Sequence, residues 1–154
     1  MRGGYLPASN FLVSVANEEV PIDASDFGQA NLNLLVELTR DADRSNRDWA
    51  TMLLGHKGPQ TDEVSEALRR AADDEDEYVR GEAIQALVER NRASALDLVR
   101  RELAKEFVCV AIFDAAAELA DPSLVSLLEP FAMPSGDDYM DGVARHALAK
   151  CKDG

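Results

Sequence analysis

The sequence predicts an all-α fold, an α-α superhelix (solenoid) of about four helix pairs preceded by an irregular N-terminal extension. Alanine and leucine are abundant, while aromatic residues make up 6% of the 154 residues, and this composition favours helices over sheets. From about residue 28 onward, apolar residues recur at positions i, i+3 and i+4, which is the spacing of helices with one buried face. An alanine followed four positions later by a leucine also recurs at a near-constant interval.

This recurring pair predicts how the helices are organised. The alanines are 33, 32 and 29 residues apart, and a period near thirty that holds two helices is typical of an α-solenoid. The pairs are Ala50 and Leu54, Ala83 and Leu87, Ala115 and Leu119, and Ala144 and Leu148.

A separate apolar helix is predicted before each of these pairs, at residues 31–40, 62–72, 93–105 and 123–129. Thr61 and Asp121 are expected N-caps, and Gly55 and Gly58 are expected to end the first repeat. The predicted repeats are 29–56, 61–90, 93–120 and 122–151. They form a repeat domain at 28–154, which follows an extension at 1–27.

The predicted extension differs in composition from the rest of the chain. Glycines and prolines punctuate it, and its segment NFLVSVA, residues 10–16, is apolar and β-branched without a helical period. We therefore expect an irregular segment that lies across the first helices or is mobile. Its apolar run is too short for a secretory signal, and the chain has nothing approaching the roughly 20 apolar residues of a membrane span. A cytoplasmic protein is expected.

Net charge restricts the expected partners. The chain has 29 acidic and 16 basic residues and a formal net charge of −13. Such a charge repels phosphate backbones and anionic lipid, so neither nucleic acid nor a membrane is expected as a partner. A protein partner is expected, and charge alone favours a basic one. The alternative explanation of the charge is solubility. The expected state is a monomer or a weak homo-oligomer.

Two segments share a charged motif. DADRSNRDWATMLL, residues 41–54, and DEDEYVRGEAIQAL, residues 74–87, place Arg47 and Arg80 three residues before the alanine. They also place Asp41 and Asp74 six residues before those arginines. These segments resemble the HEAT-repeat family, in particular the short bacterial "PBS lyase HEAT-like" repeats with the pattern D-x-D-x-x-V-R-x-x-A-x-x-x-L.

The resemblance covers roughly residues 29–151 and is specific in the first two repeats. Asn46 takes the valine position of the first repeat, while Ile112 and Asp141 take the arginine position in repeats three and four. The last two repeats therefore rest on periodicity more than on the motif.

The motif has a structural explanation. Carboxylates before a helix cap its N–H groups and meet the positive end of the helix dipole. An arginine in the first turn can reach an aspartate of its own or the adjacent repeat, which predicts a ladder of charge-assisted hydrogen bonds. The predicted structural ladder comprises Asp41, Arg47, Asp74 and Arg80.

No catalytic residue, metal or cofactor is expected. The paired His-Glu ligands of the deoxyhypusine-hydroxylase branch are missing, and His56 and His146 are expected at the surface. The charge is unsuited to the HEAT-like DNA glycosylases. Trp49 is expected to pack between helices, and Cys109, within the apolar FVCVAIF, is expected to be an inert buried thiol rather than a nucleophile.

The function expected is that of a non-catalytic protein–protein interaction module, namely an adaptor, a regulatory subunit or a neutralising partner. In solenoids, partners usually bind the concave face, and positions two before and two after each alanine are expected to point there. The resulting candidate contacts are Asp48, Met52, Gly81, Gln85, Phe113 and His146, with Ala117 and Gly142 at equivalent positions. The alternative is an enzyme or cofactor-attachment factor of the lyase-labelled proteins. An apolar patch rimmed by acid would favour the interaction module.

Overall fold

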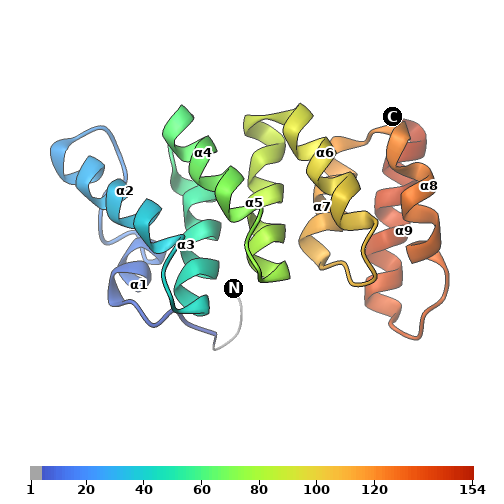
Figure 1. Ribbon diagram of the computed structural model, residues 1–154, viewed down its shortest axis with the longest axis horizontal. Helices are drawn as coiled ribbons and strands as arrows, with labels where there is room; N and C mark the ends of the chain where they lie inside the picture. Colours follow the sequence, from blue (N-terminus) through green and yellow to red (C-terminus); the bar gives the residue numbers. More distant parts are fainter. Residues whose placement is uncertain (1–4) are drawn as a thin grey trace. The chain divides into compact units, whose positions relative to one another are not determined.

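The computed structural model describes residues 5–154, and its regular structure within that range is entirely helical (Figure 1). The predicted all-α fold class is confirmed. The helices are α1 (Asn10–Ala16), α2 (Asp26–Leu38), α3 (Arg44–Lys57), α4 (Asp62–Ala71), α5 (Glu77–Arg90), α6 (Arg92–Leu103), α7 (Val110–Leu119), η1 (Pro122–Leu124), α8 (Val125–Leu128), η2 (Glu129–Ala132) and α9 (Asp138–Asp153).

The chain divides into two compact units, one ending at Ala86 and the other comprising Leu87–Gly154, and the boundary falls inside α5. In the first unit α3 packs against α1, α2 and α4. In the second unit α7 packs against α6 and α9, and α8 also contacts α9. Within residues 5–154, no helix is both long and apolar enough to cross a membrane.

Each repeat begins with a side chain that caps a helix. The Thr61 hydroxyl accepts a hydrogen bond from the Val64 N–H, and the Asp121 carboxylate accepts one from the Ser123 N–H. Pro122 follows in the first turn, where its missing N–H costs nothing. Caps of this kind each contribute about 1 kcal/mol, so these polar residues set where the helices start.

Two predicted helix boundaries are wrong. Gly55 lies inside α3 rather than at its end, whereas Gly58 is the C-cap of that helix, as predicted. A Cβ atom at Gly55 would lie 2.6 Å from the Cβ of Ala86, so the glycine permits close approach of α3 and α5. The helix predicted at 123–129 is instead a run of 3₁₀ and α turns, because Pro130 has no N–H to donate to a continuous helix.

The recurring alanines lie in the core. Ala50, Ala83, Ala115 and Ala144 are each at most 1% exposed, which lets neighbouring helices approach closely. In the fourth repeat Leu148 is only half-buried. The interior positions on that helix are taken by Ala144, Ala147 and Cys151 instead.

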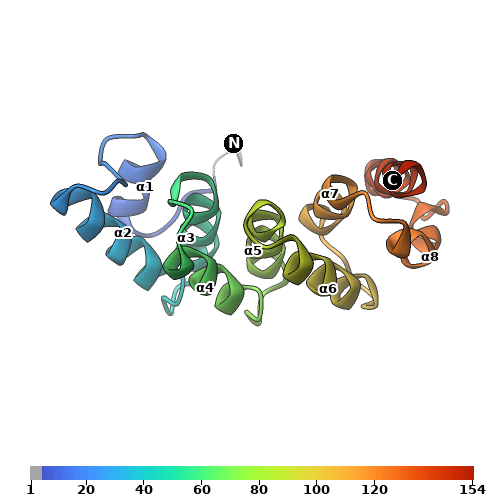
Figure 2. The same ribbon diagram turned by 90° about the horizontal axis from the view of Figure 1, so that it is seen from above.

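The N-terminal extension contains a helix that the sequence analysis missed. NFLVSVA forms α1, which buries Leu12 and Val15 and packs against α3 (Figure 2). Two turns are too few to establish a helical period, and such a short helix is stable only when tertiary packing supports it. The rest of residues 5–25 has no other helix or strand.

Candidate functional site

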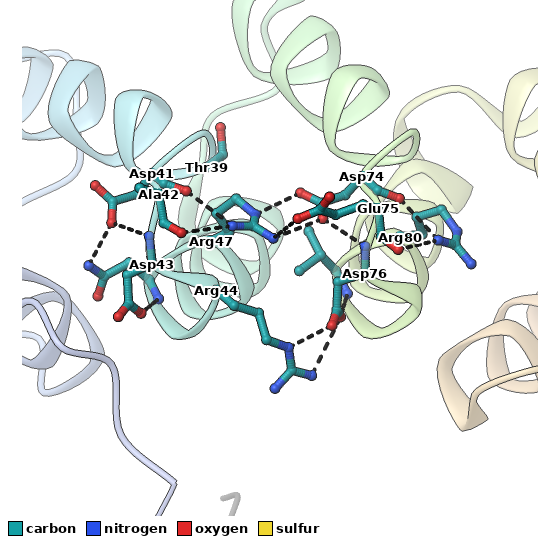
Figure 3. A network of polar contacts seen from close by, with 12 residues as sticks. Thr39, Asp41, Ala42, Asp43, Arg44, Arg47, Asp74, Glu75, Asp76 and Arg80 are labelled. Atoms are coloured by element: carbon teal, nitrogen blue, oxygen red, sulfur yellow. Dashed lines mark hydrogen bonds and ion pairs between the residues drawn. The ribbon is translucent and has the colours of Figure 1, made fainter.

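A charged network joins the loop before α3 to the loop before α5 (Figure 3). Arg47 Nε donates to Asp74 Oδ2 at 3.0 Å, and Nη2 donates to Oδ1 at 3.3 Å. The two side chains are only 12% and 10% exposed. The hydrogen bond from Arg47 to Asp74 raises the pKa of Arg47 despite the opposing effect of burial. A bidentate, mostly buried pair of this geometry joins adjacent repeats firmly.

Each arginine also closes its own loop. Arg47 Nη1 donates to the carbonyls of Asp41 and Ala42 at 3.2 and 3.3 Å. Arg80 Nη1 donates to the carbonyls of Asp74 and Glu75 at 3.0 and 3.2 Å. The two repeats thus use one geometry, in which the guanidinium binds the carbonyls six and five residues earlier. This is the kind of contact that the ladder predicts, with backbone carbonyls added.

A second, more exposed ion pair also joins α3 to the loop before α5. Arg44 Nε donates to Asp76 Oδ2 at 2.6 Å, and the Arg44 side chain is 45% exposed. Burial acts to raise the pKa of Asp76, but hydrogen bonds from Arg44 and from the N–H groups of Val79 and Tyr78 lower it below its usual value. Asp76 is therefore ionised at neutral pH and caps α5.

Asn46 accounts for the departure of the first repeat from the family pattern. Its Nδ2 donates to Asp41 Oδ2 at 3.0 Å, and its Oδ1 accepts from the Ser9 N–H at 2.8 Å. Val79, at the same position of the second repeat, is fully buried. The first repeat carries an amide here because its neighbour is the polar backbone of the N-terminal segment.

Three of the candidate contact residues on the second helices are not exposed. Asp48 and Phe113 are each 2% exposed, and Gly81 is buried as well. The Phe113 ring packs edge-on against Phe131 with centroids 5.4 Å apart. The prediction that these three residues form an open binding face is wrong. Neighbouring elements bury a larger part of each helix surface than the spacing of the alanines indicates.

The other candidate contacts are partly or fully accessible. Met52 and Gln85 are half-buried, and His146 is exposed. Burial raises the pKa of the neighbouring Asp114, and the charge of His146 opposes that shift. At the equivalent positions Ala117 is half-buried and Gly142 is exposed. These residues do not converge on the pocket described next.

An open pocket of about 290 Å³ lies in the unit Leu87–Gly154. It is formed by the loop between α6 and α7, by η2, and by the start of α9. Its apolar lining comprises Phe107, Val108, Phe113, Pro130, Phe131, Met133 and Met140. Phe107 and Met133 are 54% and 65% exposed. Large apolar side chains that remain this accessible beside a cavity are typical of a binding surface.

The polar part of the pocket is acidic. Glu106 and Asp137 are exposed, while Asp141 accepts hydrogen bonds from the N–H and the hydroxyl of Ser135 at 2.9 and 2.6 Å. The hydrogen bonds from Ser135 lower the pKa of Asp141, so this carboxylate is charged at neutral pH. None of the lining residues, all within the described part of the chain, is basic. We refer to this feature as the acid-rimmed pocket.

The sequence analysis missed Phe107 and Met133. Both lie in loops, so no helical period draws attention to them. The available signal was the presence of bulky apolar residues between the predicted helices: Phe107 follows the acidic Glu106, and Met133 precedes a segment rich in proline, glycine and acid, where solvent exposure is expected. Asp141 was noted only as a departure from the arginine position, whereas the structure places it at the pocket.

The cysteines are buried and show no features of a reactive site. Burial raises the pKa of Cys109, and burial also raises the pKa of Cys151, whose Sγ donates to the Ala116 carbonyl at 3.4 Å. The two thiols are not joined in a disulfide. A raised pKa leaves little thiolate at neutral pH, so neither is activated as a nucleophile. Within residues 5–154, no group of three or more potential metal ligands converges.

Comparison with known proteins agrees with the repeat geometry. The family model for HEAT repeats matches residues 32–120, more than half of the chain. The chain therefore belongs to the HEAT-repeat family, as its charged motif predicts.

Similar proteins are the protein YibA from Escherichia coli K12 and its counterpart from Escherichia coli O157:H7. Each is 29% identical over 122 residues, which cover 79% of this chain. The chain spans about 40% of the length of these curated relatives. A crystal structure of Escherichia coli YibA matches 91% of this chain and 54% of its own, with a TM-score of 0.64 and 24% identity. This structural similarity shows that the chain shares the fold of that protein.

Proposed function

We propose that this chain is a protein–protein interaction module without catalysis of its own, and that it binds its partner through the acid-rimmed pocket. One observation carries the proposal: Phe107 and Met133 stay more than half exposed beside an open apolar cavity. Exposed apolar surface next to a cavity supplies binding free energy when a partner covers it. Adaptor, regulatory subunit and neutralising partner are all roles that such a module fills.

The pocket replaces the concave-face positions as the proposed contact site. Asp48 and Gly81 are buried and cannot touch a partner directly, and Phe113, 2% exposed, contributes only to the lining of the pocket. The pocket has what those positions lack, an accessible apolar surface rimmed by Glu106 and Asp137. An apolar patch with an acidic rim supports an interaction module over the alternative of an enzyme or cofactor-attachment factor.

The chemistry of the pocket also supports a binding role. Its polar side chains are carboxylates and Ser135, and the Ser135 hydroxyl is already committed to Asp141. The hydrogen bonds from Ser135 lower the pKa of Asp141, so this carboxylate is a weak base for taking the Ser135 proton. We also propose that the protein is cytoplasmic and that it is a monomer or a weak homo-oligomer. Neither nucleic acid nor a membrane is proposed as a partner. The net charge of −13 supports this proposal.

The test is capture of a partner from native lysate by the immobilised chain and its variants. We expect the chain to retain a protein that Phe107→Ser and Met133→Ser both fail to retain, because each variant removes apolar surface at the pocket. Phe27→Ser is the matched control, since Phe27 lies in α2 of the other unit and is 77% exposed. Retained proteins are identified by mass spectrometry. Equal recovery by all four proteins would count against the pocket as the binding site.

A further inference from the structure

The dimensions of the acid-rimmed pocket indicate what enters it. Its volume of about 290 Å³ lies at the lower end of small-molecule sites, which span roughly 300–1,000 Å³. The lining includes the Phe113–Phe131 edge-to-face pair and the unbranched side chains of Met133 and Met140. Aromatic and methionine walls adapt to one bulky apolar group. The space therefore suits a single large apolar side chain.

The electrostatics indicate what flanks that side chain. Glu106 and Asp137 are exposed beside the cavity, and Ser135 holds Asp141 in its ionised form. Arg145, whose Nε donates to the Ala132 carbonyl at 3.1 Å, acts on Asp141 through its positive charge. One arginine offsets only part of this negative charge. A cationic group at the rim is thus favoured and an anionic one is repelled.

From these two observations we infer that the pocket binds a peptide segment of a partner protein that presents one large apolar side chain flanked by lysine or arginine. The inference rests on the proposed function and specifies its partner. The apolar side chain fills the space between Phe107 and Met133, and the flanking cation lies against Glu106 and Asp137. Anchors of this kind, a bulky apolar group in a pocket with charges at the rim, carry most of the affinity at protein interfaces.

Charge also decides against a second copy of this chain as the occupant. Two copies of a chain with net charge −13 repel each other at long range. The start of α9 beside the pocket is itself acidic, because Asp137 and Asp138 are adjacent there. A self-complementary contact at this surface would place like charges together. A basic segment of another protein meets neither obstacle.

The test is selection of a random peptide library displayed on phage against the intact chain, followed by binding measurements on a synthetic peptide of the selected sequence. We expect enriched sequences to share a large apolar residue next to lysine or arginine. Fluorescence anisotropy should show binding about tenfold or more weaker for Phe107→Ser, the scale of losing an anchor contact. The double variant Glu106→Gln/Asp137→Asn should weaken binding and flatten its dependence on salt.

The controls separate this inference from the proposed function. Asp153→Asn changes charge at the opposite end of α9 and should leave peptide binding unchanged. Circular dichroism melts verify that each variant is folded. Selected peptides that require Phe107 but carry no basic residue would overturn the inferred partner chemistry and leave the interaction module standing. Absence of enrichment, or enriched peptides that bind Phe107→Ser as well as the original chain, would overturn the inference, and the lysate capture then decides the proposed function.

Discussion

At the scale of single residues, the two ion pairs that join α3 to the loop before α5 differ in their surroundings. Arg47 and Asp74 are 12% and 10% exposed, whereas Arg44 is 45% exposed. Water competes for the outer pair and screens its charges, but it barely reaches the inner one. Identical chemistry therefore contributes unequally to stability, and burial decides by how much.

Replacing these arginines tests that difference. Arg47→Ala should lower the free energy of unfolding by about 1.5–3 kcal/mol, because hydrogen bonds to a charged group are lost and the largely buried Asp74 carboxylate loses its arginine partner. Arg44→Ala should cost less than about 1 kcal/mol. Arg47→Lys should fall between the two, because an ammonium cannot make the bidentate contact. Urea unfolding measures all three, and equal losses for Arg47→Ala and Arg44→Ala would contradict the argument.

Asp76 provides a prediction about pH. Its folded-state pKa is below its usual value, because hydrogen bonds from Arg44 and two N–H groups outweigh the effect of burial. A carboxylate with a lowered folded pKa stabilises the fold above its unfolded pKa of about 3.9, and that contribution is lost as pH falls through the folded value. Asp76→Asn should therefore destabilise the protein at pH 7, and the difference from the original chain should shrink below about pH 4. Unfolding curves at several pH values measure this difference, and a constant gap would argue against it.

At the scale of elements, two side chains at the start of α3 accept hydrogen bonds from the backbone of the N-terminal segment and attach it to that helix. Asn46 accepts from the Ser9 N–H, and the Ser45 hydroxyl accepts from the Ala8 N–H at 3.2 Å. Helix α1 then buries Leu12 and Val15 in the same unit. The N-terminal segment therefore contacts α3 at Asn46, the position that a valine, Val79, occupies in the second repeat.

The Asn46→Val variant tests this attachment. It restores the family residue, but the Ser9 N–H and the Asp41 carboxylate each lose the hydrogen bond that they make with Asn46. We expect amide hydrogen exchange to speed up across residues 9–17, with a loss of about 1–3 kcal/mol in unfolding free energy. Ser45→Ala is the matched control and should have a smaller effect, because its bond to Ala8 is exposed. Unchanged protection in Asn46→Val would show that α1 packing alone holds the segment.

At the scale of the whole molecule, the acid-rimmed pocket straddles the end of the repeat framework, and its lining residues Glu106, Phe107, Val108 and Phe113 lie within that framework. The family model matches residues 32–120, while η2 and α9, which form much of the pocket, lie beyond that range. The charged network joins α3 to the loop before α5 within the first unit, whereas the pocket residues belong to the second unit. Mutations in the charged network should therefore leave the pocket intact.

Much of the framework was predictable from local pattern. The helical period, the caps at Thr61 and Asp121, and the shared placement of Arg47 and Arg80 all depend on residues close in sequence. Local spacing determines which side chains share a helix face. Gly55 and residues 123–129 show the limit of that reasoning, because a glycine inside a helix and a proline in a short turn depend on what packs beside them.

By itself, the sequence determined the fold class, the repeat, the family and the excess of acid, since each is a matter of spacing or composition. Only the tertiary structure decided that Asp48 and Phe113 are buried, that residues 10–16 form a helix, and that the loop residues Phe107 and Met133 meet at a pocket with Asp141. Burial and convergence are set by contacts between residues distant in the chain. Periodicity within one helix carries no information about its neighbours.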